Sequence, residues 1–171
     1  MSPRPPASPV LRLDDLPLTP HAHGTGFAAG RAAIAAPLGA RHLGACLMEV
    51  PSGKAAWPFH SHHANDEMFV VLSGTGELRF GDQRHAVGPG MVAVCPAGGP
   101  ETAHQLVATG AEPLRYLAIS SMREPEVMEY PDSGKVGVVA GTAPGGAKAM
   151  RRFKASFRAA DAVDYWEGET R

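Results

Sequence analysis

From residue 43 onward, short apolar runs alternate with segments of turn-forming residues. The runs are rich in Val, Leu, Phe and Met, and they predict strands at 43–50, 57–62, 67–73, 77–80, 83–87, 91–95, 104–108 and 114–120. Gly, Pro, Asn and Asp fill the intervals, in segments such as PSGK, SGTG and VGPG. About eight short strands with regular turns are typical of an all-β sandwich or barrel. No segment of helical periodicity separates them, which argues against a parallel α/β sheet.

The pattern is weaker before these strands. Residues 1–40 begin with a Pro-rich stretch, and Pro37 and Gly39 stop the helix that the Ala-rich residues 31–41 would favour. We therefore interpret 1–40 as an extended N-terminal arm and 41–122 as the core of the barrel.

The pattern also fades after the predicted strands. Residues 123–171 are rich in turn formers, and they carry a basic run at 148–158 followed by an acidic run at 161–169. We interpret them as an irregular C-terminal tail that packs on the barrel, and we expect Trp166 to dock it there.

Composition narrows the class of protein. The chain has 171 residues, of which 44% are hydrophobic and 19% charged, as in a globular domain. The net charge of −1 argues against a chain-wide affinity for nucleic acid or an anionic membrane. No apolar stretch approaches the ~20 residues of a membrane span, and no signal core opens the chain, so we expect a cytoplasmic protein. Cys46 and Cys95 lie in apolar runs and are expected to be buried thiols.

Candidate chemistry is concentrated in the segment PFHSHHANDE. Residues two apart on a strand share a face, so His60 and His62 present their imidazoles side by side, about 7 Å apart at the backbone. Glu67 joins them only if a turn at 64–66 reverses the chain, and Asn and Asp suit such a turn. Two imidazoles and one carboxylate suit Fe(II), Mn(II), Ni(II) or Zn(II). The segment therefore predicts one divalent metal ion.

A third imidazole comes from the strand predicted to begin at His104. If the barrel closes, this strand lies beside the first pair. A set of three His and one Glu leaves one or two coordination positions open for water or substrate.

These residues resemble the motifs of the cupin superfamily. The first motif, an HxH pair, four residues, Glu, six residues and Gly, is matched by His60, His62, Glu67 and Gly74. The second is similar to Gly90, Pro96, Gly98 and His104, with three more residues before His104 than is usual. Only fifteen residues separate Gly74 from Gly90, as in small single-domain microbial cupins. The resemblance implies a jelly-roll β-barrel with the metal inside, bound by His60, His62, Glu67 and His104.

Other histidines have simpler interpretations. His21 and His23 form a second HxH pair, but the arm offers no acid beside them. His63 and His85 are expected at the surface or behind the ligands. The segment GTAPGGAK lacks the GK[ST] ending of a phosphate-binding loop, so that function is rejected.

The expected function is that of a metal-dependent enzyme acting on a small organic molecule, with oxygenase, isomerase and lyase chemistry all open. The alternative is a non-catalytic cupin that binds or senses a metal or small molecule, and a third possibility is a structural protein with an empty site. Phe69, Val71 and Leu106 are expected as apolar pocket walls, and Tyr116 and Met48 as further lining. No catalytic residue is assigned, and Glu49, Glu101 and Tyr116 are only candidates for a general base. A homodimer is expected, with residues 10–25 pairing with a sheet edge of the partner.

Overall fold

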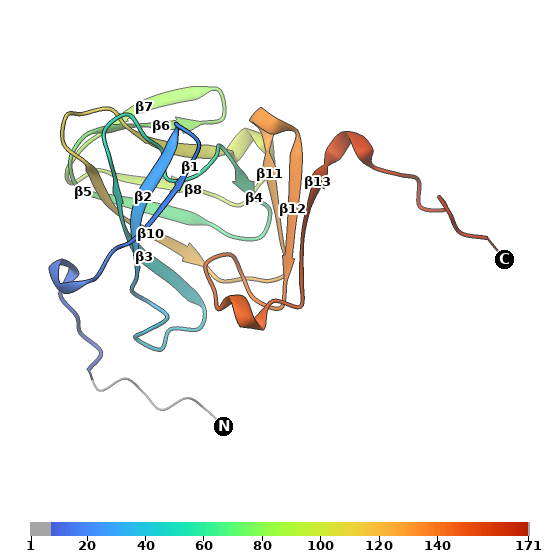
Figure 1. Ribbon diagram of the computed structural model, residues 1–171, viewed down its shortest axis with the longest axis horizontal. Helices are drawn as coiled ribbons and strands as arrows, with labels where there is room; N and C mark the ends of the chain where they lie inside the picture. Colours follow the sequence, from blue (N-terminus) through green and yellow to red (C-terminus); the bar gives the residue numbers. More distant parts are fainter. Residues whose placement is uncertain (1–7, 171) are drawn as a thin grey trace.

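The computed structural model describes residues 8–170, so the first seven residues of the predicted arm lie outside the described part of the chain. The fold is all-β, as predicted, and its thirteen strands form three sheets around one interior (Figure 1). Every ladder pair is antiparallel. Among the described residues, the regular helices are five single 3-10 turns, at Leu13–Asp15, Pro100–Thr102, Pro131–Ser133, Lys148–Met150 and Ala159–Asp161.

The largest sheet has six strands and forms one wall of the interior. Its spatial order is β1-β2-β3-β10-β5-β8, with β1 and β8 at the two edges. The strands are β1 (Thr19–His23), β2 (Phe27–Ala33), β3 (Leu43–Val50), β10 (Leu114–Ser121), β5 (Glu67–Ser73) and β8 (Val92–Cys95).

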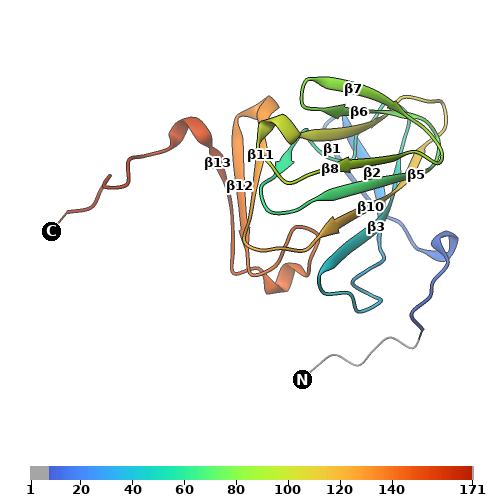
Figure 2. The ribbon, with the colours of Figure 1, turned by 180° about the vertical axis from the view of Figure 1, so that it is seen from behind.

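Two smaller sheets complete the enclosure (Figures 1 and 2). One has the order β13-β12-β11-β4 and the other β7-β6-β9. Their strands are β13 (Phe153–Arg158), β12 (Lys135–Ala140), β11 (Glu126–Tyr130), β4 (Ser61–His62), β7 (Gln83–Val87), β6 (Gly76–Phe80) and β9 (His104–Ala108).

All eight strands predicted between residues 43 and 120 are present, most of them within one residue of the expected bounds. The exception is the ligand strand predicted at 57–62, which is reduced to Ser61–His62. Pro58 lacks the amide hydrogen that a ladder position needs. His60 instead pairs with His104 as an isolated bridge.

The interpretation of the arm requires correction. Residues 19–33 form the hairpin β1–β2, and β2 pairs with β3 of the same chain. Ala29 and Ala32 of β2 are buried. These small side chains carry little hydrophobic signal, which is why the sequence pattern did not separate this strand from an arm.

The tail is also more regular than predicted. Residues 126–158 contain β11, β12 and β13, which form an antiparallel meander. The β11–β12 connection uses the Pro131–Ser133 turn and Gly134, whose φ of 60° lies in the left-handed region that glycine favours. Turn-forming residues dominate the composition of this region, so the sequence pattern did not predict the strands on either side of the turns.

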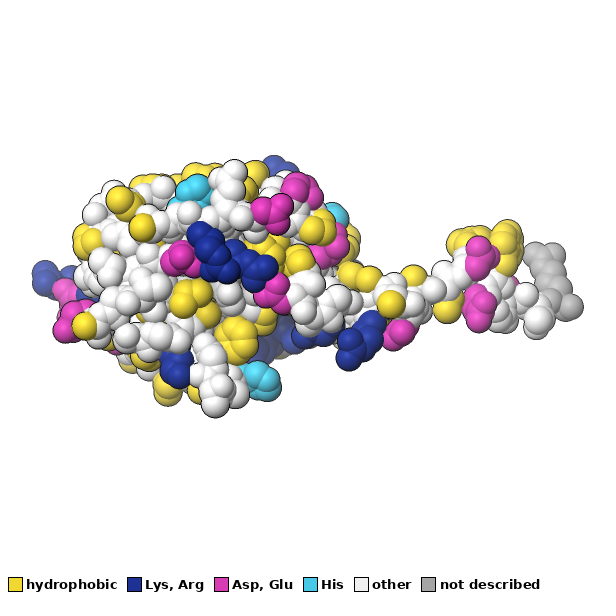
Figure 3. All heavy atoms as spheres, turned by 90° about the horizontal axis from the view of Figure 1, so that it is seen from above, with side chains coloured by type: hydrophobic (Ala, Val, Ile, Leu, Met, Phe, Trp, Pro, Cys, Tyr) yellow, Lys and Arg dark blue, Asp and Glu magenta, His cyan; other side chains and the backbone are white. Residues whose placement is uncertain are grey.

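Residues 159–170 follow a different course. They extend away from the sheets (Figures 1 and 3), and Trp166 is 71% exposed and contacts the ring of Tyr165. The expectation that Trp166 docks the tail onto the barrel is therefore wrong. Within the described residues, no helix combines the length and apolar character needed to cross a membrane.

Apolar side chains fill one end of the interior. Met48, Val50 and Leu114 are fully buried there, and Phe69 packs edge-on against Tyr116 with ring centroids 5.8 Å apart. Such burial contributes about 1.5–3 kcal/mol for each large apolar side chain. The filled end leaves the other end of the interior for the polar site.

Candidate metal centre

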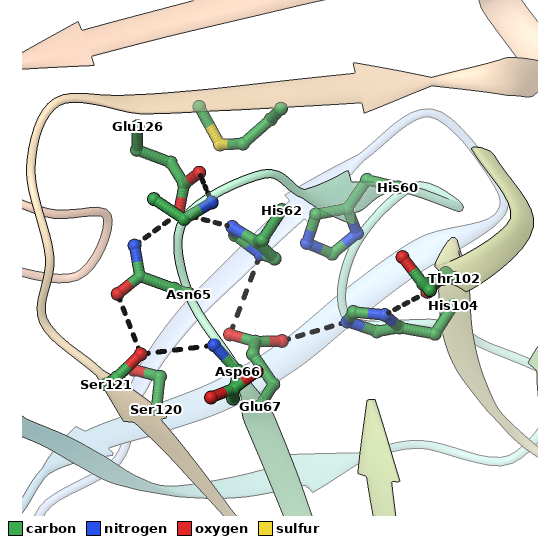
Figure 4. Close-up of polar contacts among 12 residues, drawn as sticks. His60, His62, Asn65, Asp66, Glu67, Thr102, His104, Ser120, Ser121 and Glu126 are labelled. Atoms are coloured by element: carbon green, nitrogen blue, oxygen red, sulfur yellow. Dashed lines mark hydrogen bonds and ion pairs between the residues drawn. The ribbon is translucent and has the colours of Figure 1, made fainter. Parts of the chain in front are cut away.

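Three strands and one isolated bridge bring the predicted ligands together (Figure 4). His62 lies on β4, Glu67 opens β5, His104 opens β9, and His60 is held by its bridge to His104. One ligand atom from each of these four side chains lies within 4.8 Å of the others. The cluster can therefore hold a metal ion.

The turn predicted at 64–66 places Glu67 in the cluster. Asn65 is buried and fixes this turn, since its side-chain oxygen accepts hydrogen bonds from Ser121 Oγ (3.0 Å) and the Arg123 amide (2.7 Å). Asp66 anchors the other side, where its carboxylate accepts a hydrogen bond from the Ala97 amide at 2.9 Å. The chain reverses between β4 and β5, and Glu67 faces inward despite its odd offset from His62.

His104 reaches the cluster through backbone pairing. The His104 amide donates to the His60 carbonyl at 2.8 Å, and the His60 amide donates to the His104 carbonyl at 3.2 Å. The Gly98 amide donates to the His62 carbonyl at 2.8 Å. The loop before β9 is thus tied to the ligand strand, and it contains the 3-10 turn Pro100–Thr102.

Each imidazole has an acceptor beside Nδ1. The His60 ring faces the Pro58 carbonyl at 2.8 Å, the His104 ring faces the Thr102 carbonyl at 3.1 Å, and the His62 ring faces Glu126 Oε2 at 3.2 Å. These contacts favour the tautomer that carries hydrogen on Nδ1 and leaves the Nε2 lone pair directed into the cluster. A metal ligand needs that lone pair.

Glu126 is a functional residue that sequence reasoning missed. It lies on β11, is fully buried, and accepts hydrogen bonds from His62, from the Ala64 amide (2.9 Å) and from the Asn65 side chain. Burial alone would raise the pKa of this carboxyl group, but these hydrogen bonds hold the pKa below its ordinary value. Glu126 is 64 residues from His62, and no local motif links the two.

The electrostatics of the cluster favour a cation. Burial opposes ionisation of Glu67, but the hydrogen bond from His104 and the nearby imidazoles lower its pKa to about 2. Burial, together with repulsion from His62 and His104, lowers the pKa of His60 to about 4. At neutral pH the cluster thus offers a carboxylate and a neutral imidazole, both of which are metal donors.

Two contacts indicate that the residues fit an ion. His62 Nε2 is buried and has no hydrogen-bond partner within the described part of the chain. His104 faces an acceptor on both nitrogens, since its Nε2 lies 3.0 Å from Glu67 Oε2. A neutral imidazole can donate from only one of them. A cation among the Nε2 atoms and the Glu67 carboxylate would satisfy both residues.

A cavity of about 370 Å³ opens beside the cluster. Phe69, Leu106 and Tyr116 line it, as predicted. Val71 and Met48 belong instead to the filled apolar core. Trp57, 45% exposed, is also a lining residue and stacks on His21 with ring centroids 4.3 Å apart.

Tyr130 is a second residue that sequence reasoning missed. Its ring lies nearly parallel to that of His60, with centroids 5.9 Å apart, and it lines the cavity. Burial raises the pKa of Tyr130 and that of Tyr116, so both hydroxyls stay protonated at neutral pH. Because Tyr130 alternates with Met128 and Glu126 on β11, it shares their inward face.

The remaining candidates lie outside the cluster. His63 is exposed and pairs with Glu129 at 2.6 Å, and His85 is also exposed. His21 and His23 are on β1 and do not join the ligands. Of the three candidate general bases, only Tyr116 lines the cavity, whereas Glu49 and Glu101 do not.

Comparison with known proteins identifies the family. Residues 46–120 match the family model described as the Cupin domain, and this range contains all four candidate ligands. The chain therefore contains a cupin domain. No protein with a curated description matches it in sequence.

Solved structures show the same fold. The chain resembles a protein from Acidithiobacillus ferrooxidans provisionally assigned as a sugar phosphate isomerase, with 23% identity, a TM-score of 0.76, and coverage of 91% of this chain and 96% of that one. It also resembles a cupin described as a sugar phosphate isomerase from Silicibacter pomeroyi, with 22% identity, a TM-score of 0.71, and coverage of 90% and 94%. A predicted oxalate decarboxylase from Thermotoga maritima has 19% identity, a TM-score of 0.57, and coverage of 66% and 97%. These likenesses confirm the cupin jelly roll, or double-stranded β-helix.

Proposed function

We propose that this cupin binds one divalent metal ion through His60, His62, Glu67 and His104 and acts as a metal-dependent enzyme on a small organic molecule. The observation that carries the proposal is the convergence of three imidazoles and one carboxylate beside a cavity. The neighbouring structures described as isomerases and a decarboxylase are consistent with this class of activity but share only its fold.

The side chains around the site have separate roles in this proposal. The three imidazoles and Glu67 would hold the metal, which would supply Lewis-acid chemistry toward a carbonyl or carboxylate oxygen, or oxygen chemistry. Phe69 and Leu106 exclude water from one side of the cavity. Tyr130 offers a protonated hydroxyl group as a hydrogen-bond donor to a ligand.

Metal content tests the proposal directly. We expect about one equivalent of metal per chain by elemental analysis of untagged protein, with Zn, Mn, Fe or Ni as the candidates. Replacing Glu67→Gln or His62→Ala should remove most of the metal.

His63→Ala is the matched control. His63 is next to His62 in the chain, but it is exposed and points to Glu129. Its replacement should leave the metal content unchanged. Full metal retention in both the Glu67→Gln and the His62→Ala variant would refute the proposal.

A non-catalytic binding cupin is the second candidate, and one observation favours it. Among the described residues that line the cavity, Glu67 is the only acid, and it is itself a proposed ligand. No free carboxylate is therefore available as a general base. Incubating the metal-loaded protein with a metabolite extract and following the metabolites by mass spectrometry separates the two functions. Consumption that His62→Ala abolishes supports an enzyme, and retention of a metabolite without consumption supports a binding protein.

A further inference from the structure

We propose that the side of the cavity lined by Arg31, Arg151 and Lys154 is an anion-binding subsite, in which these three side chains hold a phosphate or carboxylate group of the ligand. The inference deepens the proposed function and rests on it in one respect, that the ligand shares the cavity with the metal. All three cationic side chains line that cavity.

Arg31 occupies an unusual position for an arginine, because it faces inward from a strand. It lies opposite Met48 in the β2–β3 ladder, and Met48 is fully buried in the core. Directly opposed residues share a face of the sheet, so Arg31 points to the interior. Its guanidinium lies beside Cys46, where burial raises the pKa of the thiol and the positive charge of Arg31 opposes that rise.

The C-terminal region supplies the other two cations. Lys154 of β13 lies opposite Val139 of β12, which also lines the cavity. Arg151 precedes β13, and its Nε is buried without a hydrogen-bond partner among the described residues. Gly145 brings this region close to Arg31, since a Cβ built on Gly145 would lie 3.8 Å from Arg31 Nη2. Segments that are more than 110 residues apart in the sequence therefore meet here.

The cavity arginines have no carboxylate partner of their own. Outside the cavity, four of the eight arginines among residues 8–170 pair with carboxylates, namely Arg12 with Asp15, Arg79 with Asp132, Arg84 with Glu77 and Arg115 with Asp14, and the other four do not. Within residues 8–170, neither arginine of the cavity forms an ion pair, and nor does Lys154.

The charge balance of the cavity defines the class of ligand. Its lining contains three cationic side chains and one carboxylate, Glu67, which is committed to the imidazole cluster. A bound metal would add further positive charge. A ligand without an acceptor oxygen here would leave the buried Arg151 Nε unpaired, which is costly, and a cationic ligand would be repelled by the three positive side chains. Guanidinium groups match the planar and tetrahedral oxyanions of carboxylate and phosphate. The ligand is therefore an anionic small molecule with an oxygen donor near the metal and its oxyanion at Arg31.

Calorimetric titration of the purified protein tests the subsite. The probes are ribose 5-phosphate, unphosphorylated ribose and malonate, each titrated into metal-loaded protein and into protein stripped with a chelator. We expect ribose 5-phosphate or malonate to bind and ribose to bind at least tenfold more weakly. Binding of ribose 5-phosphate alone indicates a phosphate ligand, whereas binding of malonate alone indicates a carboxylate ligand. Arg31→Gln and Arg151→Gln should each weaken binding of the anion about tenfold or more, the range expected for a hydrogen bond to a charged group.

Arg152→Gln is the control, because it removes the same charge from an exposed neighbour that does not line the cavity. It should change the affinity less than about twofold. Equal binding by all variants, equal losses in Arg152→Gln and Arg151→Gln, or equal affinity for ribose and ribose 5-phosphate would overturn the inference. The chelator-treated arm separates the two proposals. Anion binding that depends on Arg31 in a chain that never binds metal would sink the proposed function and leave the subsite standing.

Discussion

Replacement of Glu126 by Gln should weaken metal binding without unfolding the protein. Glu126 does not line the cavity, and it acts by positioning His62. Its Oε2 accepts hydrogen bonds from His62 Nδ1 and Asn65, while Oε1 accepts from the Ala64 amide. The variant side chain has almost the same shape but only one acceptor oxygen.

The expected loss of metal affinity follows from this arrangement of hydrogen-bond donors around Glu126. If the new NH2 group takes the place of Oε2, His62 can accept from it only by carrying its hydrogen on Nε2, which then cannot ligate a metal. If the NH2 group takes the place of Oε1, it opposes the Ala64 amide, and a donor without an acceptor costs about 1–3 kcal/mol. Loss of such a partner behind a histidine ligand typically lowers metal affinity about 10- to 100-fold, or about 1.4–2.8 kcal/mol.

The assay is a competition titration of metal against a chromophoric chelator, at neutral pH, for the wild type and two variants. Glu129→Gln is the matched control, since Glu129 lies on the same strand and pairs with the exposed His63 at 2.6 Å. Urea unfolding of each metal-free protein shows how much of the change belongs to folding. We expect less than about a twofold change in metal affinity for Glu129→Gln.

Unchanged metal affinity in a folded Glu126→Gln variant would refute this reasoning. Equal losses for Glu126→Gln and Glu129→Gln would also refute it, because they would show a general effect of charge rather than control of the His62 tautomer.

Three further predictions concern pH, thiol chemistry and assembly. The pKa of His60 is lowered to about 4 and that of Glu67 to about 2, so the unfolded chain binds more protons than the folded one. The urea midpoint of the metal-free protein should therefore fall as the pH drops from 7 to 4, and it should fall less steeply in His60→Gln. A midpoint that does not change with pH would contradict this. Cys95 is buried and its pKa is raised to about 12, whereas Cys46 lines the cavity. After iodoacetamide treatment at pH 8, peptide mass spectrometry should find slow modification of Cys46 and none of Cys95 until the protein unfolds. Rapid labelling of Cys95 in the native state would be inconsistent with its burial. We propose that the free edge of β1 pairs with a second copy, so light scattering should give a dimer mass, and a monomer mass at all concentrations would reject the pairing.

The sequence alone was sufficient for the barrel strands and three of the candidate ligands. Alternation along a strand puts His60 and His62 on one face, and the turn formers Asn65 and Asp66 make it possible for Glu67 to face them. These are local relations, determined by strand period and turn chemistry over a few residues. The sequence also predicted His104, but mainly through resemblance to a family.

Tertiary structure decided the rest, because the decisive contacts join residues that are distant in the sequence. The bridge between His60 and His104 fixes the position of the third imidazole. Glu126 sets the tautomer of His62, and it lies on a strand in the region that the sequence pattern predicted to be an irregular tail. Arg31 was assigned to an arm, yet pairing of β2 with β3 turns it into the cavity. Neither periodicity nor composition records which strand edges meet, since that depends on the energy of packing the whole interior.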